Sequence, residues 1–128
     1  MIKKKINILI IEDEETQAKI LNDFLKKEGY KTQIAENGSK AIELIKKNFF
    51  DILICDYNLP DMNGLDIVQN AQEISQKSIP ILTTCVNSVD IAIRGMRNGI
   101  HDYLVKPFNY DDILKVINNR FFNHFDVF

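Results

Sequence analysis

The most informative segment of this chain reads Asp51-Ile52-Leu53-Ile54-Cys55-Asp56-Tyr57-Asn58-Leu59-Pro60. Its short apolar run is rich in β-branched residues, which is typical of a strand buried on both faces. Asp56 follows this run at the point where the chain leaves the predicted sheet. In open parallel α/β sheets, ligands bind at the carboxyl ends of the strands. The segment therefore predicts that Asp56 is a functional carboxylate, and we take it as a candidate nucleophile for phosphoryl groups.

The composition is that of an ordinary globular domain. The chain has 128 residues, of which 45% are hydrophobic and 27% charged, and its formal net charge is −2. This length predicts one domain with a core that is stable without disulfides. The net charge gives no reason to expect nonspecific binding to nucleic acid or to a membrane. No apolar segment approaches the roughly 20 residues that span a bilayer.

The cysteines and the N-terminus indicate a reducing compartment. Cys55 and Cys85 each close an apolar run, so we interpret both as small core residues. The basic residues 1–6 are followed by neither a sufficient apolar run nor a small-residue cleavage site, which argues against a signal peptide. We therefore expect a cytoplasmic protein.

Apolar periodicity predicts five strands alternating with five helices. The strands are expected at residues 6–11, 30–35, 52–55, 79–84 and 102–105. Such alternation predicts a three-layer α/β/α domain, in which helices cover both faces of a parallel sheet. The expected strand order is 2-1-3-4-5, as in flavodoxin-like folds. The whole chain, residues 1–128, is then one domain with its core at about 6–120.

Local patterns place the helices more closely. The first helix is expected at about residues 14–28, with Ile20 widening its apolar face. Ser39 is the predicted cap of the second helix. The fourth helix, which ends at Gly99, has an apolar face at helical spacing. This face is formed by Val89, Ala92, Ile93 and Met96.

We expect the C-terminal residues 121–128 to form an aromatic extension of the fifth helix. Its aromatic residues are Phe121, Phe122, Phe125 and Phe128. Either the fifth helix packs on the sheet through the helical face that Phe121, Phe125 and Phe128 share, or the aromatic residues form an exposed patch for a partner. His101 and His124 have no partners at metal-ligand spacing, and we expect both to face solvent.

Polar side chains follow four of the expected strands. These residues are Glu12, Asp13, Asp56, Thr84 and Lys106. Alone, each would more often serve a turn, a cap or the solvated surface. In the expected order their strands are neighbours about 4.8 Å apart, so that Asp13 and Asp56 would be close enough to share one cation. The long side chain of Lys106 can reach back towards Asp56.

This set of side chains predicts phosphoryl transfer. Crowded carboxylates repel one another unless a cation compensates them. A site with only oxygen ligands favours a hard cation, above all Mg²⁺. A carboxylate nucleophile, a metal, a lysine and a hydroxyl are the groups that such a reaction uses. The predicted product is an aspartyl phosphate at Asp56.

Four segments match a known family. They are Ile11-Glu12-Asp13-Glu14, Asp56-Tyr57-Asn58-Leu59-Pro60-Asp61-Met62-Asn63-Gly64, Thr84-Cys85 and Asp102-Tyr103-Leu104-Val105-Lys106-Pro107-Phe108. Over nearly its whole length the chain resembles the receiver domain of two-component response regulators, of the chemotaxis-regulator type. The resemblance implies that Asp56 accepts a phosphoryl group from a phosphohistidine of a sensor histidine kinase or phosphotransfer protein. It also implies a signalling switch that supports only its own phosphorylation and dephosphorylation, and is otherwise not an enzyme.

The resemblance assigns a role to each site residue. It implies that Mg²⁺, or Mn²⁺ in its place, binds Asp13, Asp56 and the backbone carbonyl of Asn58, with Glu12 acting mainly through water. The phosphoryl oxygens would be held by Thr84, by Lys106 and by the backbone N–H groups of Tyr57 and Cys85. Cys85 stands where alanine is usual, and Ile100 where a small residue is usual.

The resemblance also implies a conformational switch. As Thr84 moves towards the phosphoryl group, Tyr103 would turn inward and reshape the surface of the fourth helix, the fifth strand and the fifth helix. This surface would bind a downstream partner protein, a fused output domain or, in a homodimer, a second copy of the chain. Direct contact with nucleic acid is not expected of this domain. Pro107 would follow a cis peptide bond.

Other classes of protein fit these residues less well. A metal-dependent phosphatase of the haloacid-dehalogenase type, the main alternative, requires a second aspartate at position 58 as general acid, and Asn58 stands there. A flavodoxin-like electron carrier requires a phosphate-binding loop rich in Ser, Thr and Gly after the first strand, where this chain has acids. No P-loop motif is present.

Overall fold

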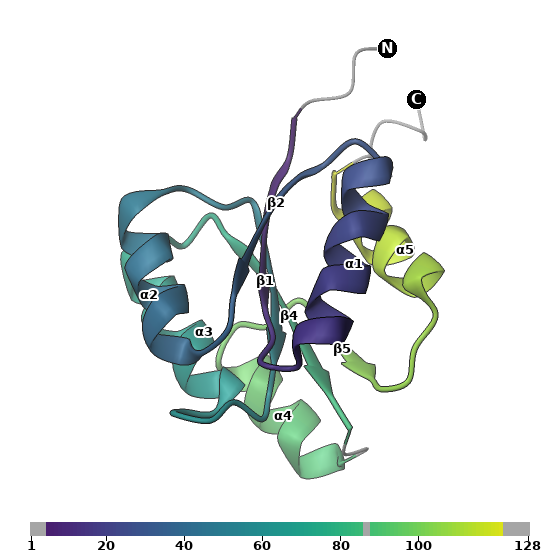
Figure 1. Ribbon diagram of the computed structural model, residues 1–128. Coiled ribbons are helices and arrows are strands. Elements are labelled where there is room, and N and C mark those ends of the chain that lie inside the picture. Colours follow the sequence, from purple (N-terminus) through teal and green to yellow (C-terminus); the bar gives the residue numbers. More distant parts are fainter. Residues whose placement is uncertain (1–4, 86–87, 122–128) are drawn as a thin grey trace, which may run out of the picture.

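The computed structural model describes residues 5–85 and 88–121. These residues form one parallel sheet in the order β2-β1-β3-β4-β5, with a helix after each strand (Figure 1). The strands are β1 (Asn7–Ile11), β2 (Lys31–Ala35), β3 (Ile52–Asp56), β4 (Ile79–Thr84) and β5 (Asp102–Val105). The helices are α1 (Glu15–Lys27), α2 (Gly38–Lys47), α3 (Gly64–Ile74), α4 (Val89–Arg97) and α5 (Tyr110–Phe121). The predicted fold class and strand order are confirmed.

Helices cover both faces of the sheet. Figure 1 shows α1 and α5 on one side, and α2 and α3 on the other. Apolar strand residues pack against each layer: Ile8 and Ile10 lie in the cluster with Leu25 of α1, while Leu9 and Ile11 lie in the cluster on the opposite face. This alternation follows from the period of two along a strand. Every residue of β3 is buried, as predicted from its apolar run.

The register of the sheet brings the strand ends together. In the parallel pairing Ile11 lies beside Cys55, and Asp56 lies beside Thr83. Asp56 is the last residue of β3, one position beyond the predicted end of this strand. The residues that follow β1, β3, β4 and β5 therefore meet at one edge of the sheet.

The prediction that Ser39 caps α2 is wrong. The cap is Asn37, whose side chain accepts a hydrogen bond from the Lys40 N–H at 2.8 Å. The N–H groups of Gly38 and Ser39 donate instead to the carboxylate of Asp61, at 2.8 and 2.9 Å. These two bonds hold the pKa of Asp61 below its ordinary value. Asp61 therefore ties the loop after β3 to the start of α2.

The predicted apolar face of α4 is not its inner face. Val89 and Met96 are about three-quarters exposed, and Ile93 is also exposed. The helix is buried at Ile91 and at Gly95, where a Cβ would lie 2.4 Å from the Cδ1 atom of Ile100. Because Gly95 has no side chain, α4 can lie close to Ile100, while Val89, Ile93 and Met96 remain exposed. Ile20, expected to widen the apolar face of α1, is likewise about half exposed.

The C-terminal predictions are tested only in part. Phe122, Phe125, Phe128 and His124 lie outside the described residues, so both interpretations of the aromatic extension stay open. His101 is exposed, as expected. Among residues 5–85 and 88–121, no helix combines the length and the apolar composition needed to cross a membrane.

Gly64 offers a test of how tightly the segment after Asp56 is packed. A Cβ at Gly64 would lie 2.5 Å from the carbonyl oxygen of Asp56 and 2.9 Å from the Cα of Tyr57. Because backbone atoms cannot rotate away, we expect Gly64→Ala to lower the free energy of unfolding by about 1–3 kcal/mol. Urea denaturation measures this change.

Gly38→Ala is the matched control for this substitution. Gly38 is also the first residue of a helix, but its added methyl group would meet the flexible side chain of Met62. We expect Gly38→Ala to lower the free energy of unfolding clearly less than Gly64→Ala does. Equal midpoints of unfolding for the two variants would contradict the close packing at Gly64.

Candidate functional site

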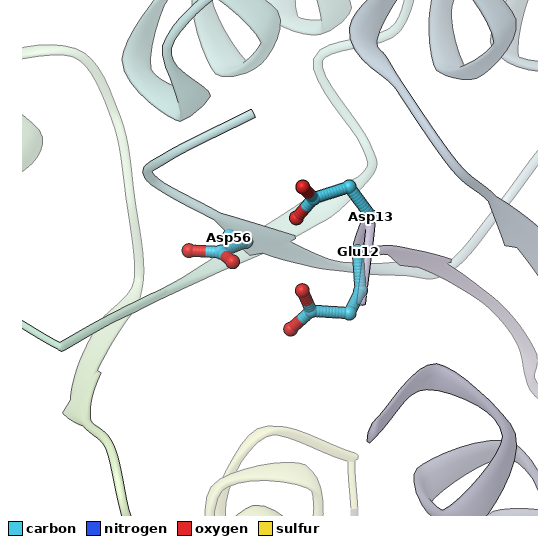
Figure 2. A group of neighbouring side chains, drawn as sticks. All are labelled: Glu12, Asp13 and Asp56. Carbon is cyan, nitrogen blue, oxygen red and sulfur yellow. The ribbon is translucent and has the colours of Figure 1, made fainter. Parts of the chain in front are cut away.

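Three carboxylates meet at the carboxyl edge of the sheet. Glu12 and Asp13 follow β1 directly, and Asp56 ends β3. One oxygen from each lies within 4.8 Å of the others (Figure 2). Glu12 and Asp56 are buried, while Asp13 is exposed and leaves one side of the group open to water. A set of oxygen ligands with an open side fits a hard divalent cation, which usually keeps several waters.

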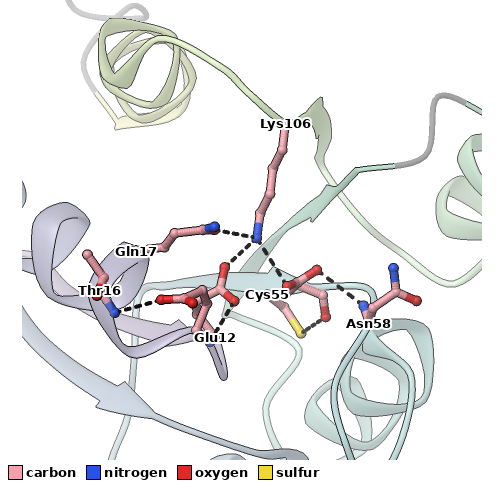
Figure 3. A network of polar contacts seen from close by, with 8 residues as sticks. Glu12, Thr16, Gln17, Cys55, Asn58 and Lys106 are labelled. Atoms are coloured by element: carbon pink, nitrogen blue, oxygen red, sulfur yellow. Dashed lines mark hydrogen bonds and ion pairs between the residues drawn. The ribbon is translucent and has the colours of Figure 1, made fainter.

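Lys106 reaches this group from the end of β5. Figure 3 shows its ammonium group bonded to both Glu12 and Gln17. Its Nζ atom also lies 3.1 Å from Oδ2 of Asp56. The side chain of Lys106 is only 15% exposed, and the two carboxylates 10% and 9%. The predicted reach of Lys106 towards Asp56 is therefore confirmed.

Burial and charge shape the ionisation of this site. Burial raises the pKa of Glu12, and although the hydrogen bond from Lys106 acts against it, the pKa stays above its ordinary value. Burial alone would lower the pKa of Lys106. The hydrogen bond to Glu12 and the charge of Asp56 outweigh this effect, so the pKa of Lys106 lies above its ordinary value. The ammonium group is therefore charged at neutral pH and compensates part of the negative charge.

The backbone after Asp56 contributes one donor to the site. The N–H of Asn58 donates to Oδ1 of Asp56 at 3.2 Å, on the carboxylate oxygen that Lys106 does not contact. The N–H of Tyr57, by contrast, donates to the carbonyl oxygen of Thr83 at 2.7 Å. Thr84, at the end of β4, is fully buried. Asn58 is thus the residue whose N–H faces the carboxylate in this structure.

Two tyrosines connect the site to α4. The hydroxyl of Tyr103 accepts a hydrogen bond from the N–H of Ser88 at 3.3 Å, directly before α4. The hydroxyl of Tyr57 accepts one from Arg94 of α4 at 3.4 Å. Both rings pack against the apolar cluster beneath α4. The peptide bond between Lys106 and Pro107 is cis, as expected.

The interpretation of Cys85 as a core residue is wrong. Cys55 is fully buried, but Cys85 is exposed. Cys85 follows the buried end of β4 and lines a cavity of about 430 Å³ beside Lys106 and Phe108. The apolar run in front of it ends at the sheet edge, and the next side chain leaves the core. An apolar run alone does not show whether the residue that closes it is buried in the core or exposed beyond the sheet.

Gln17 was not a candidate in the sequence analysis. It lies in the first turn of α1, and its Oε1 atom is 3.1 Å from the Nζ atom of Lys106. Only its position in the chain could have indicated that Gln17 lies near the site. The helix that follows β1 starts at the same edge of the sheet as Glu12 and Asp13. The pairing with Lys106 spans 89 residues of sequence, and no local pattern indicates it.

The sequence matches a known protein family. Residues 8–118 match the family described as the response regulator receiver domain. The transcriptional regulatory protein ZraR of Klebsiella oxytoca is 32% identical over 111 residues, which are 86% of this chain and 25% of ZraR. The chain therefore spans about a quarter of the length of this relative.

Solved structures share the fold. A CheY-like receiver domain protein from Methanospirillum hungatei has a TM-score of 0.88 and 26% identity, over 91% of this chain and 94% of that chain. A response regulator from Burkholderia pseudomallei contains a phosphorylated aspartic acid, a calcium ion and citrate. It has a TM-score of 0.84 and 27% identity, over 88% of this chain and 66% of that chain.

The two cysteines should differ strongly in reactivity. Burial raises the pKa of the Cys55 thiol, and the charges of Asp56 and Glu12 add to this effect. Because the thiolate is the reactive form, we expect a maleimide to label Cys85 at least about 100-fold faster than Cys55 in the folded chain at pH 8. Mass spectrometry of digested peptides measures both rates. Cys85→Ser should abolish the fast reaction, and similar rates for the two thiols would contradict the exposure of Cys85.

Proposed function

The chain belongs to the family of response regulator receiver domains, and from this premise we propose that it is a phosphoacceptor switch whose acceptor is Asp56. One observation carries the proposal: the buried carboxylate of Asp56 lies beside the acids that follow β1 and is also within hydrogen-bond distance of the ammonium group of Lys106. As a receiver domain the chain is a signalling module. The proposal adds that it supports only its own phosphorylation and dephosphorylation.

The donor in this proposal is a phosphohistidine of a sensor kinase or phosphotransfer protein. An oxygen of Asp56 attacks the phosphorus atom, so that a P–O bond forms while the P–N bond to the histidine breaks. The imidazole nitrogen keeps the electron pair of the broken bond and takes up a proton. The product is an aspartyl phosphate. Because the donor histidine belongs to an intracellular signalling partner, the proposal places the chain in the cytoplasm.

Residues of the chain hold the transferred group. Lys106 is already within hydrogen-bond distance of Asp56, and its charge stabilises the phosphoryl oxygens. Thr84 would add its hydroxyl only after leaving its fully buried position, because Thr83 and Cys85 line the cavity beside Lys106. Cys85 would add its backbone N–H. The N–H of Tyr57 is bonded to Thr83 in the sheet, whereas that of Asn58 faces Asp56. We therefore assign to Asn58 the phosphoryl contact that the family resemblance gave to Tyr57.

Asp13, Asp56 and the backbone carbonyl of Asn58 are the proposed ligands of Mg²⁺ or Mn²⁺, and Glu12 would act mainly through water. The arrangement of Glu12, Asp13 and Asp56 supports this assignment, because their oxygens lie within 4.8 Å of one another. When bound, the cation would neutralise charge that would otherwise repel the phosphoryl donor. The phosphorylated aspartic acid and calcium ion of the Burkholderia protein are consistent with such a site.

A metal-dependent phosphatase is the weaker proposal. The residue two positions after the nucleophile would have to act as general acid, and the amide of Asn58 cannot. The N–H of Asn58 donates to the carboxylate of Asp56 instead, so this residue is placed to donate a hydrogen bond to a phosphoryl group on Asp56.

We place the output of the switch at α4, β5 and α5. Tyr103 contacts the start of α4 through Ser88, so a change in its rotamer would alter that end of the helix. The exposed apolar residues Val89, Ile93 and Met96 make α4 a suitable surface for another protein. A second copy of the chain is the partner we propose. Because the chain spans a quarter of ZraR, a fused output domain is compatible with the proposal.

Phosphorylation of Asp56 is the direct test. With Mg²⁺ and acetyl phosphate, the intact chain should gain the mass of one phosphoryl group. Asp56→Asn should lose this adduct, because an amide cannot form the acyl phosphate. Mass spectrometry of the intact protein measures the adduct.

Asp61→Asn is the control for this test, because Asp61 is also an acid near the site but bonds the start of α2. It should keep the adduct. An unmodified wild-type chain, or an adduct that persists in Asp56→Asn, would contradict the assignment of Asp56.

The apolar face of α4 provides a separate prediction. If a second copy binds there, phosphorylation should shift the wild-type chain towards a dimer in sedimentation velocity experiments at about 100 μM. Met96→Asp should stay monomeric, because a charge cannot be buried in an apolar contact without large cost. Ile20→Asp, at an exposed apolar position of α1, should still dimerise. A phosphorylated wild-type chain that remains monomeric would overturn the proposed homodimer.

A further inference from the structure

We infer that Gln17 is a positioning residue for phosphoryl transfer, acting through Lys106. The inference rests on the proposed function, because it concerns the lysine that would stabilise the transferred group. It assigns to Gln17 the task of orienting the ammonium group of Lys106 before the phosphoryl group arrives. Gln17 itself would not touch the reacting atoms.

The hydrogen bonds of Lys106 are the first observation. An ammonium group has three N–H donors. Its three acceptors are oxygens of Glu12, Asp56 and Gln17, which come from the end of β1, the end of β3 and the first turn of α1. One acceptor for each donor leaves the ammonium group little freedom to rotate. Gln17 supplies the third of these bonds, from α1.

The three acceptors differ in charge and exposure. The bonds to Glu12 and Asp56 are ion pairs between largely buried groups. Gln17 is exposed, and its amide oxygen carries no formal charge. Once a phosphoryl group forms on Asp56, the negative charge moves to its oxygens, and the donor that is now bonded to Asp56 passes to them. The neutral bond to Gln17 and the ion pair with Glu12 remain, and they keep the ammonium group oriented during the transfer.

The residue type suits this task. An acid at position 17 would add another negative charge to a site that already has three carboxylates, and a basic residue would repel Lys106. A neutral side chain with an oxygen acceptor avoids both effects. The position is held by the packing of α1, because Ala18, Leu21 and Leu25 are its buried residues. Replacing Gln17 should therefore leave the helix in place.

Gln17→Met tests this inference, because methionine keeps the approximate length of the side chain but has no strong acceptor. We expect the rate constant of phosphorylation by acetyl phosphate to fall about fivefold. This corresponds to about 1 kcal/mol in the barrier. The Mg²⁺ concentration that gives half of the maximal rate should not change, because Gln17 is not among the carboxylates. The same substitution at Gln69, an exposed residue of α3, is the matched control and should leave the rate unchanged.

A double-mutant cycle shows whether Gln17 acts through Lys106. In a Lys106→Ala background, Gln17→Met should cause no further loss of rate. NMR spectra of the Lys106 ammonium group give a readout independent of phosphorylation. Gln17→Met should shift its ¹⁵Nζ resonance and speed its hydrogen exchange, whereas Gln69→Met should do neither.

The outcomes separate this inference from the proposed function. If the wild-type chain is phosphorylated on Asp56 and Gln17→Met reacts at the wild-type rate, the positioning role is wrong and the switch stands. A loss of rate that persists in the Lys106→Ala background also refutes it. If the wild-type chain forms no adduct, the proposed function fails, while the NMR comparison still decides whether Gln17 orients Lys106.

Discussion

The ammonium group of Lys106 lies between two carboxylates that would otherwise repel each other in a largely buried site. Burying a charge without a partner costs far more than burying an ion pair with complete hydrogen bonds. Glu12 directly follows β1, and Asp56 ends the neighbouring strand β3, so the two cannot move apart without disturbing the sheet. The positive charge of Lys106 reduces the repulsion between the two carboxylates. Its side chain also links the end of β5 to the ends of β1 and β3. The geometry around Asp56 therefore depends on a residue 50 positions later in the chain.

The parallel sheet makes this pairing possible. Strands that all run in one direction place their carboxyl ends at a single edge, and the order 2-1-3-4-5 sets the acids of β1 beside Asp56. The segment after β3 is then fixed from several sides. Asp61 bonds the start of α2, and the N–H of Gly64 donates to the carbonyl oxygen of Tyr57 at 2.7 Å. These contacts hold the N–H of Asn58 towards the carboxylate, so the loop acts as part of the site.

Strand and helix positions could be predicted from the sequence because each apolar run ends close to a polar residue or a turn former, as at Asp56 and Gly99. The same patterns failed where exposure depends on a distant neighbour. The inner face of α4 is set by the contact of Gly95 with Ile100, which a count of apolar residues does not detect. Cys85 follows a buried strand but lies beyond the sheet edge. Gln17 joins the site through a partner 89 residues away, and a helix position alone does not indicate a hydrogen bond.

The charge balance of the site explains why phosphorylation can move Lys106. Counted by formal charge, three carboxylates and one ammonium group leave two negative charges, which a divalent cation would neutralise. A phosphoryl group on Asp56 moves the negative charge outward from the carboxylate to the phosphoryl oxygens. Lys106 then follows this charge with the donor that it now directs at Asp56. Because its ion pair with Glu12 is buried, Lys106 can turn while one of its bonds persists. The bond to Gln17 is a second one that persists, and it keeps the ammonium group oriented while the charge moves.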